Sequence, residues 1–180
     1  MSAPVLASVL FLGWGNPSRG DDAIGTLLCD RLDQLLGRPD LAAVAARTEV
    51  QQDFQLQVED ASDISGRDLV VFIDASVSAP APFEFSRVEP VDDASVTTHA
   101  LSPAAVVAVA CKIFGQTPLC YQIAVRGEAF ELGEGLSAAA SLHLEAAWRA
   151  LQQIALADDP PAAAVALAAA GTPGGNRLAA

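Results

Sequence analysis

The sequence predicts an α/β fold, a three-layer α/β/α sandwich around a mostly parallel, twisted sheet. Short apolar runs that end in turn residues recur along the chain, namely VLASVLFLG (5–13), DLVVFIDAS (68–76) and LCYQIAVRG (119–127). Such runs are typical of strands that are buried on both faces. Segments with helical spacing separate these runs, and strands that alternate with helices form parallel sheets covered on both faces.

Three helices are predicted from their spacing and their end signals. The apolar residues of DAIGTLLCDRLDQLLG (22–37) recur at helical spacing until Gly37. A second helix begins with Ser102 as N-cap, has a proline at its first position and ends at Gly115. The inward residues expected on it are Val106, Val109, Ala110 and Ile113. A third helix is expected from about residue 138 to residue 156.

Two weaker strands complete the predicted sheet. Residues 45–50 alternate weakly between polar and apolar types, which indicates a second strand, and residues 51–65 are expected to form a turn and a short helix. Residues 83–90 alternate more clearly, which predicts a strand with one solvated face.

The C-terminal segment differs in composition from the rest of the chain. Residues 158–180 are rich in Ala, Pro and Gly and contain no aromatic residue. We expect a flexible tail there, with a short helix at 162–170. A single domain of residues 1–157 is therefore predicted.

The charge of the chain limits its partners. Ten Lys and Arg against 22 Asp and Glu give a net charge of −12, which repels nucleic acid and anionic membranes and suits a cation or a basic peptide. No apolar run reaches the roughly 18 to 20 residues that span a bilayer. The first residues lack the basic flank of a signal peptide, so a cytoplasmic protein is expected.

The cysteines and serines offer little for nucleophilic catalysis. Cys29, Cys111 and Cys120 are widely spaced in apolar stretches, without a CxxC pair, so we expect small buried side chains in a reducing compartment. A catalytic thiol is the alternative. Ser18 lacks the G-x-S-x-G context of a nucleophile elbow, and His143, in the middle of a helix, is expected to be structural.

Three polar residues follow predicted strands: Asp22, Asp74 and His99. The carboxyl ends of parallel strands meet at one edge of the sheet, so these residues are expected to lie close together. Two carboxylates and one imidazole form a plausible first shell for a divalent transition metal, and three protein ligands leave positions for water or a substrate.

The turn GWGNPSRGDD has competing interpretations. It lacks the GK[ST] of a P-loop and the glycine spacing of a dinucleotide site, and acidic side chains at a helix start would repel a phosphate. Either Asp21 or Asp22 is expected to cap the helix, but a cap explains only one of them. The alternative to metal binding is an Asx-turn for Asp74 and a hydrogen-bonded position in a loop for His99.

The stretch GWGNPSRGDDAIG resembles the G-x-G-N-x-x-x-x-D-[DE]-x-x-G signature of the [NiFe]-hydrogenase maturation proteases, the C-terminal endopeptidases of hydrogenase large subunits. IDAS and THALSPAAVV are similar to the second and third signatures of that family, and RGEAFELGEGLS is similar to its Gly-rich segment. The resemblance extends from about residue 9 to about residue 155. It departs from the family where many members carry an Asp-Gly-x-Thr element after the second strand, since this chain reads TEVQQDFQLQVEDASD there.

The resemblance implies a function and a site. It implies that Asp22, Asp74 and His99 are the metal-binding and catalytic residues. The implied reaction removes a short peptide from a large-subunit precursor after nickel insertion. The nickel is carried by the precursor, and other divalent metals are expected to substitute in the site. A monomer is expected, and QLQVEDASD is similar to the branch that serves NAD-linked, bidirectional hydrogenases. A non-catalytic chaperone that binds nickel or the large subunit is the alternative.

Overall fold

The computed structural model describes residues 7–91, 101–115 and 118–171. Its centre is a five-stranded sheet with the order β2-β1-β3-β5-β4. The strands are β1 (Val9–Trp14), β2 (Thr48–Asp53), β3 (Leu69–Ser76), β4 (Phe83–Arg87) and β5 (Leu119–Arg126). The first four in spatial order run parallel, and β4 pairs antiparallel with β5 at one edge. The predicted mostly parallel sheet is confirmed.

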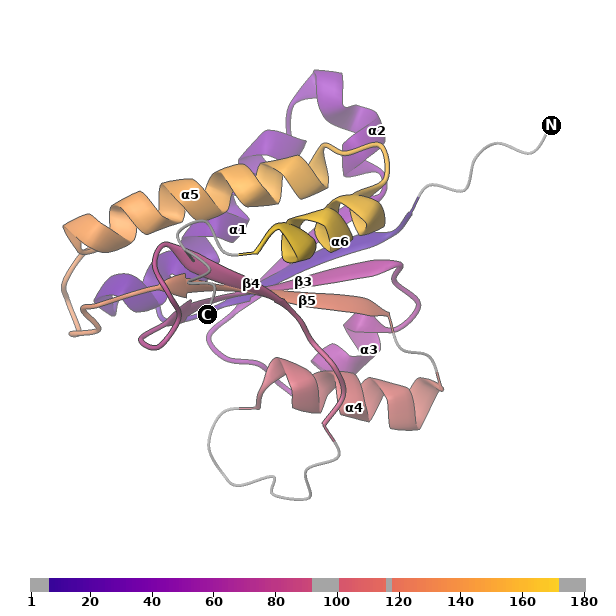
Figure 1. The fold of residues 1–180 in the computed structure, drawn as a ribbon, viewed down its shortest axis with the longest axis horizontal. Helices are drawn as coiled ribbons and strands as arrows, with labels where there is room; N and C mark the ends of the chain where they lie inside the picture. Colours follow the sequence, from indigo (N-terminus) through magenta and orange to yellow (C-terminus); the bar gives the residue numbers. More distant parts are fainter. Residues whose placement is uncertain (1–6, 92–100, 116–117, 172–180) are drawn as a thin grey trace, which may run out of the picture.

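Helices cover both faces of this sheet (Figure 1). The helices are α1 (Ile24–Leu36), α2 (Ala42–Ala45), α3 (Asp60–Ile64), α4 (Pro103–Phe114), α5 (Ala138–Ala155) and α6 (Pro160–Ala170), with 3₁₀ turns η1 (Gly20–Ala23) and η2 (Pro39–Leu41). Helices α1, α5 and α6 lie on one face, and α3 and α4 lie on the other. The predicted three-layer arrangement is therefore confirmed.

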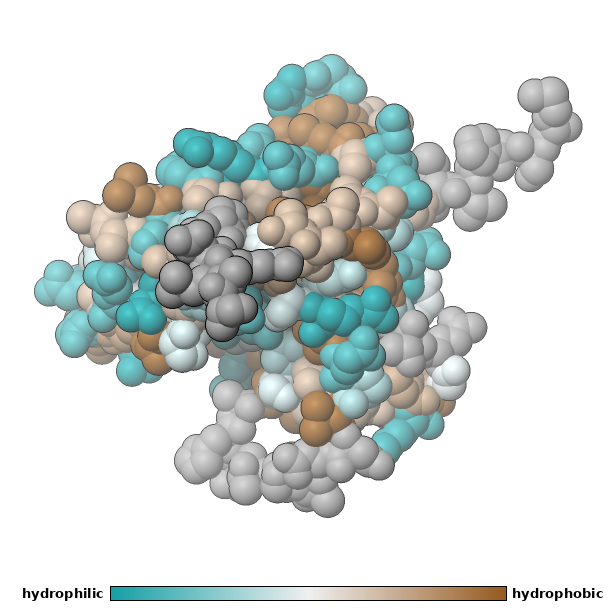
Figure 2. Space-filling view, viewed as in Figure 1, coloured by the Kyte–Doolittle hydropathy of each residue, from teal (hydrophilic) through white to brown (hydrophobic). Residues whose placement is uncertain are grey.

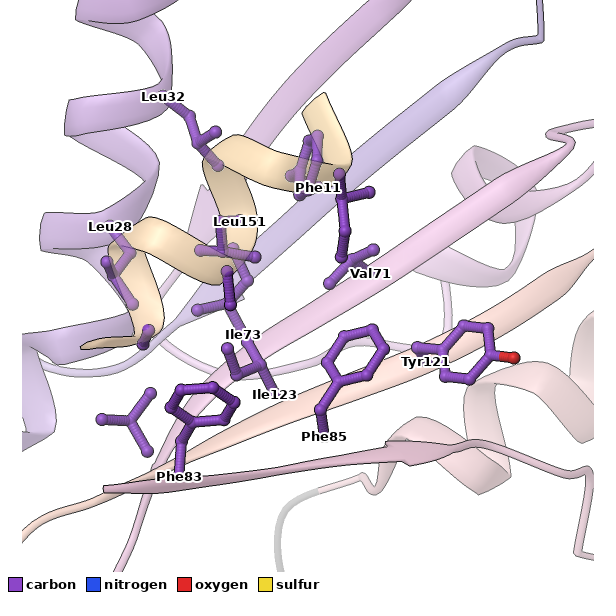
Figure 3. Packing of buried hydrophobic residues seen from close by; sticks show 14 of the residues in the cluster. Phe11, Leu28, Leu32, Val71, Ile73, Phe83, Phe85, Tyr121, Ile123 and Leu151 are labelled. Atoms are coloured by element: carbon purple, nitrogen blue, oxygen red, sulfur yellow. The ribbon is translucent and has the colours of Figure 1, made fainter. Parts of the chain in front are cut away.

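Each strand contributes to two cores because its side chains alternate between the faces. In β1, Phe11 packs among residues of α1 and α5, whereas Leu10 and Leu12 pack among residues of α3 and α4. Figure 3 shows the first core, in which the rings of Phe85 and Tyr121 stack with centroids 5.0 Å apart. Burial on both faces explains why the central strands have continuous apolar sequences.

The short helix predicted at 162–170 is present as α6, but it packs against the domain and is not part of a flexible tail. Asp159 caps this helix by accepting a hydrogen bond from the amide of Ala162 at 3.0 Å. Ala164 is fully buried in the first core. Small alanine side chains let the helix approach the core closely, so the ordered domain extends to residue 170.

Two further local predictions are wrong in detail. Strand β2 covers Thr48–Asp53 rather than 45–50, because its pairing with β1 sets its extent. Ile113, expected to face inward, is 66% exposed, since it lies beyond the residues of α4 that pack in the core. Across the described ranges, no helix combines the length and the apolar character that a membrane span requires.

Candidate metal centre at the carboxyl ends of the strands

The start of α1 packs directly on the ends of two neighbouring strands. Strands β1 and β3 pair in register, with Gly13 opposite Ile73. A side chain at Gly25 would collide with the carbonyl oxygen of Trp14 and would lie 2.9 Å from that of Ile73. This close approach places η1, which carries Asp22, beside the end of β3, where Asp74 follows Ile73.

The turn between β1 and η1 folds back onto Asp22. Gly15 has a φ of +140°, and a side chain there would collide with the carbonyl oxygen of Asp22, so the turn requires glycine. The amide of Asn16 donates a hydrogen bond to Asp22 Oδ2 at 2.9 Å. The side chain of Asn16 in turn accepts from the amide of Ser18 at 2.9 Å. Within the described residues, the Asp22 carboxylate is thus bound to the turn through Oδ2.

Asp21, the neighbour of Asp22, is fully buried and has a different role. Its carboxylate accepts hydrogen bonds from the amides of Glu128 (2.7 Å), Ala129 (2.9 Å) and Ser137 (2.7 Å), and from the Ser137 hydroxyl (2.9 Å). Burial alone would raise the pKa of Asp21, but these four hydrogen bonds lower it below its ordinary value. The carboxylate is therefore ionised and ties η1 to the Gly-rich segment before α5.

This result corrects the expectation that one of the two aspartates caps a helix. The N-cap residues of η1 and α1 are Arg19 and Ala23, and neither start has a side-chain cap. The two adjacent carboxylates have different roles. Asp21 fixes the position of the turn, and Asp22 faces the strand ends.

Asp74 is the second carboxylate at this edge. Burial raises its pKa to about 7, a hydrogen bond from the Ala75 backbone opposes the rise, and the negative charge of Asp22 adds to it. The contact between η1 and β3 brings the two residues to the same end of the sheet. In the part of the chain that the structure describes, neither carboxylate forms an ion pair with Lys or Arg, and two such carboxylates favour the approach of a positive ion.

The third predicted ligand, His99, lies outside the described residues. In the part of the chain that the structure describes, no three His, Cys, Asp or Glu side chains gather closely enough to hold a metal on their own. The structure thus brings Asp22 and Asp74 to one edge of the sheet, and the membership of His99 in this group stays a prediction.

The remaining candidates have structural roles. Cys29 and Cys120 are buried, and burial raises the pKa of each thiol to about 12, which disfavours the reactive thiolate. His143 Nδ1 lies 2.8 Å from the backbone oxygen of Arg126, as expected of a structural histidine.

Comparison with known proteins finds similar solved structures. No family model and no curated protein sequence matches the chain. Solved structures do match. The [NiFe] hydrogenase maturation protease HycI from Thermococcus kodakarensis has 25% sequence identity and a TM-score of 0.61, with 81% of this chain and 90% of that chain covered. The hydrogenase maturating endopeptidase HybD from E. coli has 27% identity and a TM-score of 0.59, with 80% and 89% covered. This chain therefore resembles the hydrogenase maturation proteases in both fold and sequence.

The likeness to these two maturation proteases supports a hydrolase of the processing endopeptidase type. A solution structure of an endopeptidase from Escherichia coli, at 24% identity and a TM-score of 0.60 over 83% of this chain and 91% of that one, adds support for the fold alone. The role of Asp21 was not predicted from the sequence. Its hydrogen-bond donors belong to the Gly-rich segment and to Ser137, the N-cap of α5, which lie more than 100 residues away, so no local signal indicates it.

Proposed function

We propose that this chain is a nickel-dependent, C-terminal processing endopeptidase. Its substrate would be the precursor of a [NiFe]-hydrogenase large subunit, from which it removes a short peptide after nickel has been inserted. One observation supports the proposal: η1, which carries Asp22, contacts β3, which carries Asp74 near its carboxyl end, in a fold shared with hydrogenase maturation endopeptidases. His99 completes the proposed metal-binding trio.

The chemistry of the two carboxylates suits a divalent cation carried by the substrate. The Asp22 carboxylate is held through Oδ2 by the amide of Asn16. Burial and the charge of Asp22 make the ionised form of Asp74 costly, and a divalent cation would relieve both. Oxygen and imidazole ligands are compatible with nickel and with other divalent metals, which are expected to substitute.

The proposed reaction is hydrolysis of one peptide bond beside this site. A water oxygen adds to the scissile carbonyl carbon, the C–N bond breaks, and the new amine receives a proton while the other proton of the water is lost from the new carboxyl. Holding the precursor through its nickel would place the scissile bond at the site, and such positioning contributes several kcal/mol. The metal would supply either Lewis-acid activation or recognition alone, and a carboxylate is the candidate general base.

Attack by water is supported by the state of the cysteines. The buried thiols Cys29 and Cys120 are held far from their thiolate form. A thiol nucleophile, the alternative considered from the sequence, therefore has no support from these two residues.

The proposal is tested with purified protein and two forms of the same precursor, one loaded with nickel and one free of nickel. The intact mass of the large subunit reports the loss of the peptide. We expect loss only from the nickel-loaded form, and cleavage of both forms at one rate would overturn the metal dependence. A His99→Ala protein that processes at the normal rate would remove His99 from the trio.

A non-catalytic chaperone that binds nickel or the large subunit is the second candidate. It would change the nickel content of the precursor without shortening it, so the same mass measurement separates the two.

We further propose that the protein acts as a cytoplasmic monomer. The segment 55–63 favours a substrate of the NAD-linked, bidirectional type, and partial sequencing of the processed partner would test this.

A further inference from the structure

A surface groove adjoins the turn that holds Asp22. It lies between α1 and the end of β2 and has a volume of about 280 Å³. Its lining includes Gly15, Pro17, Leu27, Asp30, Asp53 and Phe54. We call it the strand-end groove.

The lining of this groove is largely apolar, although it lies at the surface. Phe54 directly follows β2, and its side chain is 64% exposed. Pro17 is exposed and Leu27 is only partly buried. Exposed large apolar side chains that gather at a concave site are typical of binding surfaces. Figure 2 shows other apolar side chains exposed among hydrophilic ones at the end of the molecule where the strands stop.

The polar part of the groove is acidic. Asp30 accepts a hydrogen bond from Gln52 Nε2 at 3.0 Å, and Asp53 accepts one from Gln57 Nε2 at 2.9 Å. In the described ranges, neither carboxylate forms an ion pair with Lys, Arg or His. Burial raises the pKa of the nearby Asp33, and the charge of Asp30 adds to the rise, which shows the local excess of negative charge.

The groove is continuous with the candidate metal centre. The amide of Gly15 donates to the Asp53 backbone oxygen at 3.1 Å, so the turn and the end of β2 form one wall. Asn16, between the two turn residues that line the groove, donates to Asp22. The groove and the turn that holds Asp22 therefore share Gly15 and Pro17.

We propose that the strand-end groove binds an extended segment of the substrate precursor, with an apolar side chain against Phe54 and basic side chains beside Asp30 and Asp53. The identity of the occupant rests on the proposed function, whereas its chemistry rests on the lining of the groove. A second copy of this chain is a poor occupant, because its net charge of −12 would be brought against the acidic wall. Phe54 and Asp30 are thus specificity-determining residues outside the metal trio.

The binding test uses fluorescein-labelled decapeptides of alanine and glycine with one central leucine flanked by arginines. Fluorescence anisotropy is compared with two altered peptides, one with glutamate in place of arginine and one with alanine in place of leucine. We expect the basic, leucine-containing peptide to bind most tightly. The Phe54→Ala change should weaken its binding about fivefold to tenfold, as for removal of an aromatic anchor.

Matched controls are available on the same chain. Ile113, 66% exposed on α4, has nearly the exposure of Phe54, so Ile113→Ala should leave binding unchanged. Asp30→Lys should weaken binding about threefold at low salt and less at high salt, because exposed charges are screened. Glu84→Lys, on the exposed side of β4 at the other edge of the sheet, makes the same charge change and should have no effect.

Any of three results would overturn the groove proposal: no binding of the basic peptide, equal binding of the acidic peptide, or equal effects of Phe54→Ala and Ile113→Ala. The processing assay separates this failure from failure of the proposed function. If the nickel-loaded precursor is cleaved with the same KM by wild type and Phe54→Ala, the groove proposal fails and the function stands. If Phe54-dependent peptide binding is found but the precursor is never shortened, the function fails and the groove stands.

Discussion

The two ends of the strands, called here the amino edge and the carboxyl edge of the sheet, differ in how their charged side chains are paired. At the amino edge, where the strands begin, charged groups have local partners. Arg67 pairs with Glu49 and also donates from Nε to the Asp63 backbone oxygen at 3.0 Å. The guanidinium of Arg47 donates to backbone oxygens at the end of α5, including that of Asp158 at 3.1 Å.

At the carboxyl edge, Asp22, Asp30 and Asp53 accept hydrogen bonds from neutral groups, and within the described ranges none of them forms an ion pair with Lys or Arg. Asp22 and Asp74 repel each other there, and Asp30 and Asp53 line the strand-end groove. The exposed ring of Phe54 adds apolar surface to the same edge. The ion pairs and hydrogen bonds at the amino edge therefore stabilise the fold. At the carboxyl edge, carboxylates that form no ion pair within the described ranges are suited to a cationic ligand.

The largest effect is expected on the rate of precursor processing, when one carboxylate from each edge is replaced by alanine. Asp22→Ala should lower the rate of precursor processing about 100-fold or more, because the site loses an oxygen ligand and its positioning of the bond. Glu49→Ala should leave that rate unchanged and cost about 1 kcal/mol or less of stability, as is usual for an exposed ion pair. Processing is followed by mass and stability by urea unfolding. Equal effects of the two changes on processing would break the comparison between the edges.

Asp21 is the exception at the carboxyl edge, because its charge is fully satisfied. Asp21→Ala should lower the free energy of unfolding by about 3 kcal/mol, since the amides of Glu128, Ala129 and Ser137 lose their acceptor in a buried place. Urea unfolding of Asp21→Ala and Asp22→Ala, side by side, measures the contrast. We expect a change of less than about 1 kcal/mol for Asp22→Ala, since Asp22 is only partly buried and accepts one backbone hydrogen bond. A larger cost for Asp22→Ala than for Asp21→Ala would contradict the different roles of the two residues.

A smaller effect concerns the pH dependence of stability. The pKa of Asp74 in the folded protein, about 7, lies above its ordinary value of 3.8. The stability that this carboxyl contributes is full below pH 3.8 and is lost as the pH rises through about 7. Asp74→Asn should therefore stabilise the metal-free protein by about 2 kcal/mol at pH 8 and by much less at pH 4.

Urea unfolding of wild type and Asp74→Asn at the two pH values checks this expectation. The matched control is Asp68→Asn, since Asp68 lies on the amino side of β3 and accepts from the amide of Ser8 at 2.7 Å. A gain in stability from Asp74→Asn that is the same at both pH values would show that burial of charge is not its cause.

Much of the fold could be predicted because local patterns and burial agree. The apolar runs of the central strands and the capped helix after Ser102 both form as expected. The weaker segments could not be placed from pattern alone. The extent of β2 depends on its pairing with β1, and α6 is fixed by its packing on the core although its composition is typical of a tail.

The candidate site, like the fold, could be predicted only in part. Positions after strand ends predicted Asp22 and Asp74 as neighbours, because parallel strands bring their carboxyl ends to one edge. The function of Asp21 could not be predicted, since its partners are more than 100 residues away in the sequence. His99 lies outside the described residues, so its part in the site remains a prediction.

The sequence by itself determined the layered architecture, the acidic character and the two carboxylates at the strand ends, because periodicity and strand-end position are local properties. Only the tertiary structure decided which of two adjacent aspartates is buried, where the domain ends and that a groove adjoins the turn. These features depend on contacts between segments far apart in the chain, and no local pattern encodes such contacts.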